Sequence, residues 1–419
     1  MSTVVIVGGN VAGGRAAETL RQQGFDGRIV LVGAEPERPY ERPPLSKEYL
    51  LGQVAEEKLY LRPPAYYDEQ GIELWLGAPV TRLAPHGGPR SRHVELADGR
   101  RLPYDKLLIA TGAAPRQLAV PGADLPGILY LRTLRDAREL RRGMSAVSRV
   151  CVVGAGFIGA EVAASCRGAG RDVVMLEMES WPLERALGRE VGRICAAIHR
   201  AHGVDLRTGE RVVGFRGHGR VEQAVTASGH AVDCDLIVVG VGVVPECGWL
   251  EGSGVALRNG VLVDEMCATN VPGVYAAGDV ANWWHPTLGT RLRVEHFDNA
   301  QNQGVAAAKS MLGVGQPYAP VAFFWSDQYD LKLQYVGHTT GQDDVVLRGS
   351  VEAASWSAFY VRDGYLVAAL AANRFKDVAA ARQLIARRTP VEPRRLADER
   401  TDLRALAKAP AAHPGTLSS

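Results

Sequence analysis

The stretch that decides the fold lies close to residue 1 and reads Val4-Val5-Ile6-Val7-Gly8-Gly9-Asn10-Val11-Ala12-Gly13-Gly14. Its first four residues are all apolar and β-branched, which predicts a buried parallel strand. The strand breaks into a glycine-rich turn, and residues 15–21 (RAAETLR) then favour a helix. A strand, turn and helix of this kind bring unpaired backbone N–H groups and the positive end of the helix dipole to one point. A pyrophosphate can bind there.

The spacing of the glycines is close to the dinucleotide-binding pattern G-x-G-x-x-G but incomplete. Gly8 and Gly13 hold the outer places, whereas Asn10 stands where the middle glycine belongs. Alone, this is a weak signal. The pattern returns complete in VVGAGFIGAE (152–161), again between a predicted strand and a predicted helix.

The segments that follow each glycine turn also repeat. Each turn is followed by a second apolar strand with an acid at or just past its end, Glu35 in the first copy and Glu177 in the second. An acid in this place can accept the hydroxyls of a nucleotide ribose. Each copy then continues through an alternating, turn-rich meander to a closing strand, at 106–110 and 236–240. The repeat predicts two dinucleotide-binding domains, the second inserted within the first.

Three further segments suit an anionic ligand. Residues 274–280 (VYAAGDV) predict a buried strand with Asp279 at its carboxyl end, where ligands of open α/β sheets bind. Asp298 or Asn299 can cap a helix that runs to about residue 312. In 39–47 (PYERPPLSK), tandem prolines stiffen a segment between Arg42 and Lys47 and are expected to lead into a helix capped by Ser46. A solvated charged loop is the alternative for this last segment.

Composition limits the classes of protein that fit. The chain has 419 residues, 46% of them hydrophobic and 22% charged, as expected for a globular protein of two or three domains. The net charge of +2 gives no general affinity for nucleic acid. No apolar run approaches the roughly 20 residues of a membrane span. The first strand begins by Val4, which leaves no room for a signal peptide, so we expect a cytoplasmic protein.

The six cysteines are scattered, without a C-x-x-C or similarly close pair. This spacing argues against a disulfide framework and against a zinc or iron–sulfur site held by the protein. No metal site is predicted. Buried thiols are the favoured interpretation.

Taken together, the motifs occur in an order that resembles the FAD-dependent ferredoxin and rubredoxin reductases of oxygenase systems. These putidaredoxin-reductase-like proteins lie within the pyridine nucleotide-disulfide oxidoreductase superfamily, and the resemblance covers almost the whole chain. The segments that carry it are PYERPPLSK (39–47), LLIATGAAPR (107–116), GAGFIGAEVA (154–163), VYAAGDVA (274–281), VEHFDNAQNQG (294–304) and FWSDQYDLKLQ (324–334). The first and last of these are far more specific than a glycine turn.

The resemblance implies an α/β fold of glutathione-reductase type, with two Rossmann-like domains and a C-terminal α+β domain. An FAD-binding domain is expected over 1–113 and 246–322, and a NAD-binding domain over 114–245. The C-terminal domain is expected over 323–408, with a disordered tail at 409–419.

The resemblance also implies a set of FAD contacts. Gly8, Gly13 and the start of the first helix would lie at the pyrophosphate, and Glu35 at the adenosine ribose. Lys47 would lie near the reacting flavin edge, Asp279 near the ribityl chain and Trp325 against the isoalloxazine. The other cofactor-binding residues expected around the two nucleotides are Asn10, Arg42, Val80, Ala110, Thr111, Gly112, Arg116, Ile158, Gly242, Gly278, His296 and Phe297.

The second glycine turn would hold the nicotinamide dinucleotide through Gly154, Gly156 and Gly159. Glu161 and Glu295 are expected near the nicotinamide end, and Lys47, Glu161 and Trp325 are the expected catalytic residues. Glu177 favours NADH over NADPH, because a carboxylate accepts ribose hydroxyls and repels a 2′-phosphate. Arg185 and Arg189 follow soon after and could soften that preference.

Two residues depart from the family pattern. Asn10 adds a side chain where the backbone approaches phosphate closely, so the site works only if that side chain turns away or joins the contact. Phe297 stands where related sequences often have tryptophan. His296 invites an acid–base role, but hydride transfer to a flavin needs none, and a structural histidine is the favoured interpretation.

The implied activity is NADH-dependent reduction of FAD, followed by electron transfer to a small ferredoxin of the two-iron two-sulfur type. Such a ferredoxin supplies a cytochrome P450 or a ring-hydroxylating dioxygenase. Residues 1–150 contain no cysteine, so the disulfide and single-cysteine peroxidase routes of this superfamily are closed. Rubredoxin reductase and NADH oxidase are alternatives of the same fold, and an apoptosis-inducing-factor-like interaction protein is an alternative of another class. Basic residues for docking an acidic ferredoxin occur at Arg374, Lys376, Arg382, Arg387, Arg388, Arg394 and Arg395.

Overall fold

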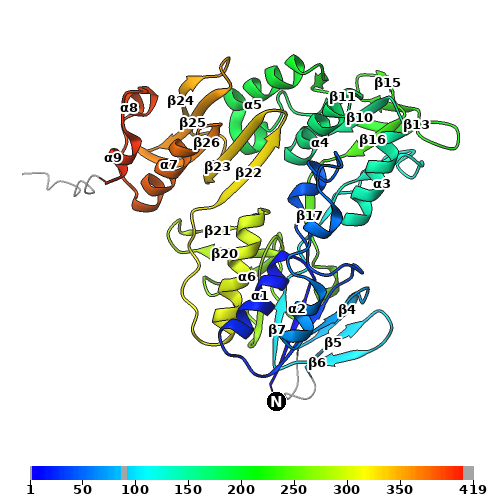
Figure 1. Cartoon of the computed structure of the whole chain (residues 1–419), viewed down its shortest axis with the longest axis vertical. Helices are drawn as coiled ribbons and strands as arrows, with labels where there is room; N and C mark the ends of the chain where they lie inside the picture. Colours follow the sequence, from blue (N-terminus) through cyan, green and yellow to red (C-terminus); the bar gives the residue numbers. More distant parts are fainter. Residues whose placement is uncertain (1, 86–91, 409–419) are drawn as a thin grey trace, which may run out of the picture. The chain divides into compact units, whose positions relative to one another are not determined.

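The computed structural model describes residues 2–85 and 92–408, and the chain forms two compact units (Figure 1). The tail expected at 409–419 lies outside the described residues. The first unit comprises 1–44, 54–114 and 243–320, and the second comprises 45–53, 115–242 and 321–419. Segment 45–53, which we placed within the FAD-binding range, is thus part of the second unit.

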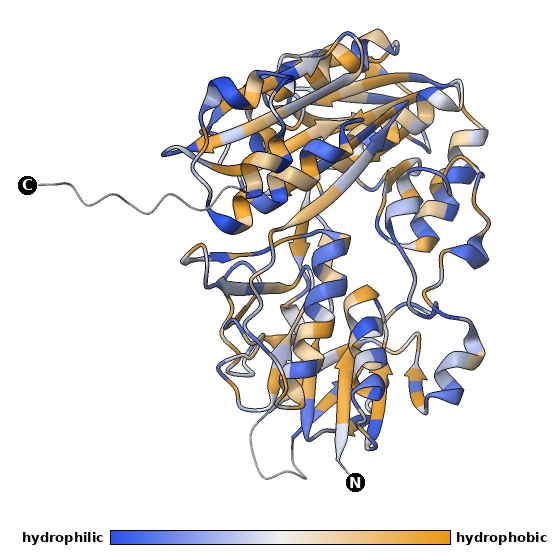
Figure 2. Ribbon diagram, turned by 60° about the vertical axis from the view of Figure 1, so that its left-hand side comes forward, coloured by the Kyte–Doolittle hydropathy of each residue, from blue (hydrophilic) through white to orange (hydrophobic). Residues whose placement is uncertain are grey.

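A five-stranded parallel sheet forms the core of the first unit. Its strands, in spatial order, are β19 (Val274–Ala276), β7 (Lys106–Ile109), β1 (Thr3–Val7), β2 (Arg28–Val32) and β3 (Ile72–Trp75). Val5 lies in register between Val30 and Leu107, and all three are fully buried. In Figure 2 these strands are largely orange, in keeping with the β-branched and leucine side chains that a doubly covered sheet requires.

Helices α1 (Val11–Gln22) and α6 (Phe297–Met311) pack closely against each other in the first unit. A Cβ at Gly304 would lie only 2.3 Å from the carbonyl oxygen of Ala12, so glycine permits this approach. The smaller elements of the unit are α2 (Pro64–Glu69), the sheet β4 (Val80–Ala84), β5 (His93–Leu96), β6 (Arg101–Pro103), and the sheet β18 (Val261–Val263), β20 (Ala281–His285), β21 (Thr290–Leu292).

The second unit contains a parallel sheet of the same design. Its strands, in spatial order, are β12 (Asp205–Thr208), β11 (Asp172–Glu177), β10 (Arg149–Val153), β16 (Leu236–Val239) and β9 (Ile128–Tyr130). The helices are α3 (Leu134–Ser145), α4 (Phe157–Gly168) and α5 (Glu184–Ala201). A meander of β13 (Val212–Arg216), β14 (Gln223–Thr226) and β15 (Ala231–Asp233) precedes β16, and the short strands β8 (Ala113–Pro115) and β17 (Val243–Pro245) pair where the chain changes unit.

The last part of the second unit is an antiparallel sheet with three helices. The strands, in spatial order, are β22 (Phe323–Gln328), β23 (Leu331–Gly337), β26 (Tyr365–Ala372), β25 (Ser355–Arg362) and β24 (Asp344–Ser350). The helices are α7 (Phe375–Arg387), α8 (Pro393–Ala397) and α9 (Leu403–Lys408). The predicted fold class, two Rossmann-like domains and a C-terminal α+β domain, is confirmed.

Two predicted helix starts were wrong. Ser46 ends a 3₁₀ helix, Pro43–Ser46, instead of capping an α-helix, and its hydroxyl bonds elsewhere. The residues after Ser46 form hydrogen-bonded turns and not an α-helix, so no helix start is present there for Ser46 to cap. Helix α6 begins at Phe297 with His296 as its N-cap, so neither Asp298 nor Asn299 is the cap. The Asn299 amide instead donates to the carbonyl of Val294.

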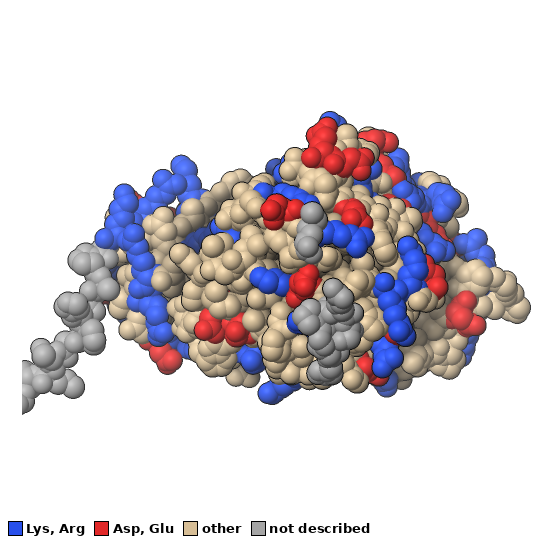
Figure 3. All heavy atoms as spheres, turned by 90° about the horizontal axis from the view of Figure 1, so that it is seen from below, with Lys and Arg blue, Asp and Glu red and all other residues tan. Residues whose placement is uncertain are grey.

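Both cationic and anionic side chains are exposed on the face shown in Figure 3, with cationic ones gathered at its left edge and anionic ones at its top. Among residues 2–85 and 92–408, we find no helix whose length and hydropathy would let it cross a membrane.

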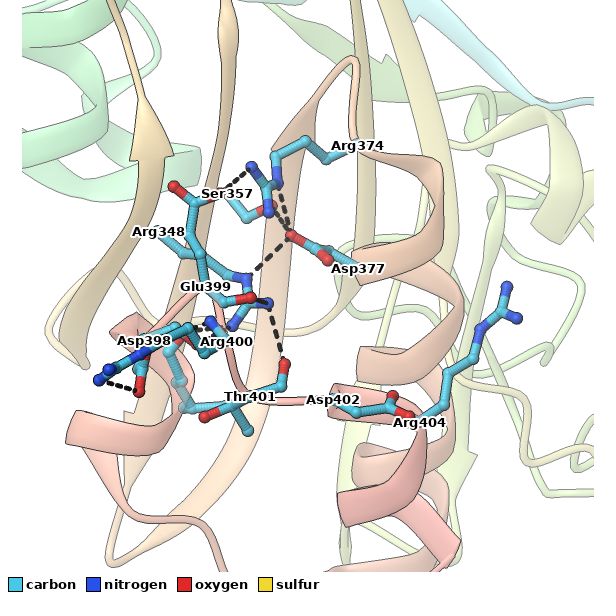
Figure 4. A network of polar contacts seen from close by, with 11 residues as sticks. Arg348, Ser357, Arg374, Asp377, Asp398, Glu399, Arg400, Thr401, Asp402 and Arg404 are labelled. Atoms are coloured by element: carbon cyan, nitrogen blue, oxygen red, sulfur yellow. Dashed lines mark hydrogen bonds and ion pairs between the residues drawn. The ribbon is translucent and has the colours of Figure 1, made fainter.

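A buried arginine fastens the last helices to the sheet (Figure 4). The Arg348 guanidinium on β24 donates to the carbonyl oxygens of Asp398 at 2.8 Å and Thr401 at 3.0 Å. It also donates to those of Leu396 and Glu399, each at 3.2 Å. Since Arg348 is buried, its loss would leave several carbonyl groups without this donor.

We therefore expect Arg348→Leu to lower the free energy of unfolding by about 3 kcal/mol and to expose residues after 393 to protease. Chemical denaturation and limited proteolysis measure the two effects. Arg400→Leu is the control, because that side chain is 90% exposed and pairs with Asp398 at the surface. A surface pair contributes at most about 1 kcal/mol, so equal losses in the two variants would contradict the expectation.

Candidate dinucleotide-binding and catalytic site

The first glycine turn joins β1 to α1 and leaves no space for side chains at its outer glycines. Gly8 has a φ of 125°, and a Cβ there would lie 2.1 Å from the carbonyl oxygen of Ala110. A Cβ at Gly13 would lie 2.1 Å from the carbonyl oxygen of Gly8. The first turn of α1 contains no acid, and the N-cap side chain makes no capping hydrogen bond. The helix start therefore fits an anionic group such as a pyrophosphate.

Asn10, the departure from the glycine pattern, is the N-cap of α1 but its amide is used elsewhere. Its Oδ1 accepts a hydrogen bond from Nη2 of Arg42. The same Nη2 lies 2.6 Å from Oε1 of Glu35, and the Tyr40 hydroxyl donates to Oε2 of Glu35. Three residues expected at the FAD site, Asn10, Glu35 and Arg42, are thus joined into one cluster.

Electrostatics around Arg42 support a role in holding anions. Burial would lower the pKa of the Arg42 guanidinium, but the nearby Tyr40, Glu35 and Asp279 raise that pKa above its ordinary value. Arg42 is therefore a permanent cation near the carboxyl ends of β2 and β19. Asp279 follows β19 and is buried.

The other residues expected at the FAD site in the first unit lie at strand ends and at the start of α6. Ala110, Thr111 and Gly112 follow β7, and Gly112 has a φ of 72°. The N–H of Gly278 donates to the Gln303 side chain at 2.9 Å. Val80 is half-buried at the start of β4, and His296 and Phe297 are the N-cap and first residue of α6. Glu295, which was expected near the nicotinamide end, also lies in the first unit and pairs with Arg293 at 2.6 Å.

The second glycine turn has the complete pattern and a different middle position. A Cβ at Gly154 would lie 2.5 Å from the carbonyl oxygen of Gly240, and one at Gly159 would lie 2.0 Å from that of Gly154. At Gly156, in contrast, the nearest such atom is 4.0 Å away. The outer glycines are required by the protein's own packing, whereas the middle one leaves room beside the start of α4. That room fits a dinucleotide pyrophosphate.

Glu177 ends β11 beside this turn. Its Oε2 accepts from the backbone N–H of Ala155 at 2.6 Å, and its Oε1 accepts from that of Glu179 at 2.8 Å. The two nearby cations that could favour a 2′-phosphate both have acidic partners. Arg185 pairs with Glu179, and Arg189 lies 3.4 Å from Glu184.

Glu161, on α4, accepts hydrogen bonds from three side chains. Its Oε2 accepts from Nζ of Lys47 at 2.9 Å and from Oγ of Ser46 at 2.5 Å. Its Oε1 accepts from Oγ of Ser326 at 2.7 Å. The prediction did not include Ser46 or Ser326 as site residues. Ser46 lies in the segment PYERPPLSK (39–47) and Ser326 in FWSDQYDLKLQ (324–334). Their place in these two family-specific segments was the signal in the sequence that could have identified them.

The other predicted members of the second unit are less buried. Trp325 is half-buried on β22, and its ring lies 6.3 Å from that of Phe323 at an interplanar angle of 28°. Ile158 is 45% exposed at the start of α4. Arg116 is exposed, and its N–H donates to the carbonyl of Gly242 at 2.9 Å.

The structure therefore groups the predicted residues into two sets, one in each unit. Lys47, expected with the FAD contacts, belongs to the second unit with Glu161 and Trp325. The roles of all these residues remain predictions. Within the described part of the chain, no group of histidines, cysteines and acids could hold a metal ion, and the six cysteines are free thiols.

Two parallel sheets, each with a glycine turn shaped for a pyrophosphate, define a protein of the two-dinucleotide oxidoreductase class. The chain belongs to the pyridine nucleotide-disulphide oxidoreductase family, whose model matches residues 2–304. Residues 323–407 match the reductase C-terminal domain model.

Characterised relatives resemble the chain over its full length. It is 40% identical to rhodocoxin reductase of Rhodococcus erythropolis over 420 aligned residues, covering 100% of this chain and 97% of the relative. Two solved structures are also similar. The ferredoxin reductase for the CYP199A2 system of Rhodopseudomonas palustris has a TM-score of 0.93 at 37% identity, covering 97% of this chain and 100% of that one. The covalent complex of putidaredoxin reductase with putidaredoxin gives a TM-score of 0.92 at 36% identity, covering 97% and 98%.

The Asn10–Arg42 contact leads to a prediction about flavin affinity. In Asn10→Leu the amide is replaced by an apolar group of similar size, so Arg42 loses the Asn10 oxygen as a hydrogen-bond partner. We expect FAD to dissociate about tenfold more readily, measured by flavin fluorescence on dilution. Gln22→Leu, at the exposed far end of the same helix, is the control. Unchanged FAD affinity in Asn10→Leu would show that this cluster does not support the flavin.

Proposed function

We propose that the chain is an NADH-dependent flavoprotein reductase that passes electrons through FAD to a small iron–sulfur ferredoxin. The ferredoxin, of the two-iron two-sulfur type, would supply an oxygenase such as a cytochrome P450 or a ring-hydroxylating dioxygenase. The observation that supports this best is the pairing of two glycine turns with a reductase C-terminal domain over the full length of ferredoxin reductases. A cytoplasmic location stays part of the proposal.

The residues of the first unit would hold FAD. The start of α1 would receive the pyrophosphate, and the Asn10–Arg42–Glu35 cluster would fix the cation and the acid that flank it. When bound, FAD supplies the chemistry of accepting a hydride and releasing electrons singly. The protein's contribution is to bind, to orient and to supply charge.

The residues of the second unit would hold NADH and shape the reaction. Gly156 leaves room for the NADH pyrophosphate, and Glu177 would accept ribose hydroxyls. The Lys47–Glu161 pair places an ammonium and a carboxylate together in a buried environment. A buried pair of this kind holds its two members in one geometry, because either charge alone would be costly to bury.

Docking of an acidic ferredoxin is proposed on the C-terminal sheet and helices. Of the basic residues expected there, Lys376, Arg382, Arg387, Arg388, Arg394 and Arg395 are exposed. Arg374 differs, because its guanidinium is held by Asp377 at 2.7 Å and Glu399 at 3.0 Å (Figure 4). We therefore assign docking to the exposed cations and a structural role to Arg374.

An anaerobic reduction experiment tests the proposed function. NADH should bleach the purified yellow protein, and added two-iron two-sulfur ferredoxin should then restore the yellow colour as it becomes reduced. Cytochrome c, which the reduced ferredoxin reduces in turn, reports this electron transfer through its change in absorbance. A protein that binds no flavin would contradict the proposal. In a separate assay in air, rapid NADH-dependent oxygen consumption without ferredoxin reduction would instead identify an NADH oxidase.

Glu177 should determine the choice of nucleotide. In Glu177→Ala the 2′-phosphate of NADPH is no longer repelled, so the ratio of kcat/KM for NADH over NADPH should fall about tenfold or more. Glu222→Ala, which removes an exposed acid that precedes β14 in the same unit, is the control and should change the ratio much less. Steady-state rates with ferricyanide measure both. An unchanged ratio in Glu177→Ala would remove this residue from the nucleotide site.

A further inference from the structure

The hydrogen bonds of Glu161 raise the question of what its non-ionic partners do. The carboxylate is 4% exposed and has three side-chain donors, of which Lys47 is the only cation. Lys47 and Ser46 both bond to Oε2, whereas Ser326 bonds to Oε1. Ser326 therefore controls the oxygen that the lysine does not touch. A buried carboxylate oxygen requires such a donor.

The orientation of the Ser326 hydroxyl is fixed by its second partner. Nε2 of Gln328 donates to Oγ of Ser326 at 3.2 Å, which occupies an acceptor position of that oxygen. The single hydroxyl proton is then directed to Oε1 of Glu161 at 2.7 Å. Ser326 and Gln328 are both buried, so water does not compete for these bonds.

Ser326 also sets the position of β22 against α4. Phe324 and Ser326 lie on one face of β22, and Phe157 and Glu161 lie one turn apart on α4. The rings of Phe157 and Phe324 are 4.6 Å apart. Two residues along a strand and four along a helix both advance by roughly 6–7 Å, so the two contacts match in spacing. Trp325, between them, points to the opposite face of the strand.

We propose that Ser326 is a positioning residue for hydride transfer, which holds the Glu161 carboxylate and, through it, the Lys47 ammonium in their reactive arrangement. This inference rests on the proposed function, because it assumes that Glu161 and Lys47 serve the NADH-to-flavin step. It goes beyond the proposed function by assigning a role to the Ser326 hydroxyl, which acts only through the Glu161 carboxylate. The same contact fixes the strand that carries Trp325.

The test compares rapid flavin reduction in the wild-type holoenzyme and in Ser326→Ala. Under anaerobic mixing with NADH, the limiting rate of flavin reduction should fall about five- to tenfold in the variant. The NADH concentration at half-maximal rate should change less than twofold. Reoxidation of the pre-reduced enzyme by ferricyanide should keep its rate. An unchanged limiting rate would overturn the proposal.

Ser357→Ala is the matched control. Ser357 lies on β25 of the same sheet, is 0% exposed like Ser326, and donates to a carboxylate, Asp377, at 2.9 Å (Figure 4). Its loss should lower thermal stability to a similar degree and leave flavin reduction at the wild-type rate. If Ser357→Ala slows reduction equally, general loosening of the sheet explains both effects and the proposal fails.

A double variant tests whether Ser326 acts through Glu161. Glu161→Gln should slow flavin reduction, and adding Ser326→Ala should change that rate by less than twofold, because the bond is already altered. If the two substitutions slow flavin reduction independently, so that the fold-reductions in rate multiply in the double variant, the proposal is overturned. If Glu161→Gln alone reduces flavin at the wild-type rate, the proposed site itself is wrong. If Ser326→Ala reduces flavin at the wild-type rate while Glu161→Gln is slow, only the role proposed for Ser326 is wrong.

Should Ser326→Ala not accumulate as a flavin-bound protein, Ser326→Cys takes its place. The thiol is of similar size and a weaker donor, so the limiting rate should fall by about two- to fivefold. A wild-type rate in that variant would overturn the proposal as directly as in the alanine variant.

Discussion

The constraint on which both units depend is the close approach of a helix start to a neighbouring strand end. In the first unit the carbonyl oxygen of Ala110 occupies the space that a side chain on Gly8 would need. In the second unit the carbonyl oxygen of Gly240 does the same at Gly154. Each approach requires a glycine with positive φ. It directs the first N–H groups of a helix toward the carboxyl edge of a parallel sheet, which makes an anion site.

The two turns differ in what they contribute beside that shared geometry. At Gly156 the protein leaves room, whereas at Asn10 it adds an amide that bonds Arg42. The side chain at the middle position of the first turn thus holds a cation in place. A cluster of Asn10, Arg42 and Glu35 is fixed before any ligand arrives, so less ordering is needed when the cofactor binds.

Much of the fold could be predicted because its signals are local. The apolar strands, the glycine turns and the acids at strand ends recur in the same order, and the structure has both parallel sheets. The amide of Asn10 could not be placed, because its partner Arg42 is distant in sequence. The same holds for Ser326 and Glu161, which are joined only by the packing of β22 on α4. Prediction of Ser46 as a helix cap used local propensity, and a tertiary bond to Glu161 took the hydroxyl instead.

Segment 45–53 is encoded within the first unit but belongs to the second. It carries Ser46 and Lys47, two of the three donors to Glu161. A fragment cut at the ends of the expected NAD-binding range, 114–245, would therefore lack Lys47 and leave the buried Glu161 carboxylate without its cation. Exchange of whole domains between relatives has to carry this short insert along with α4. The two units therefore have to be engineered together, because their sequence ranges are interleaved.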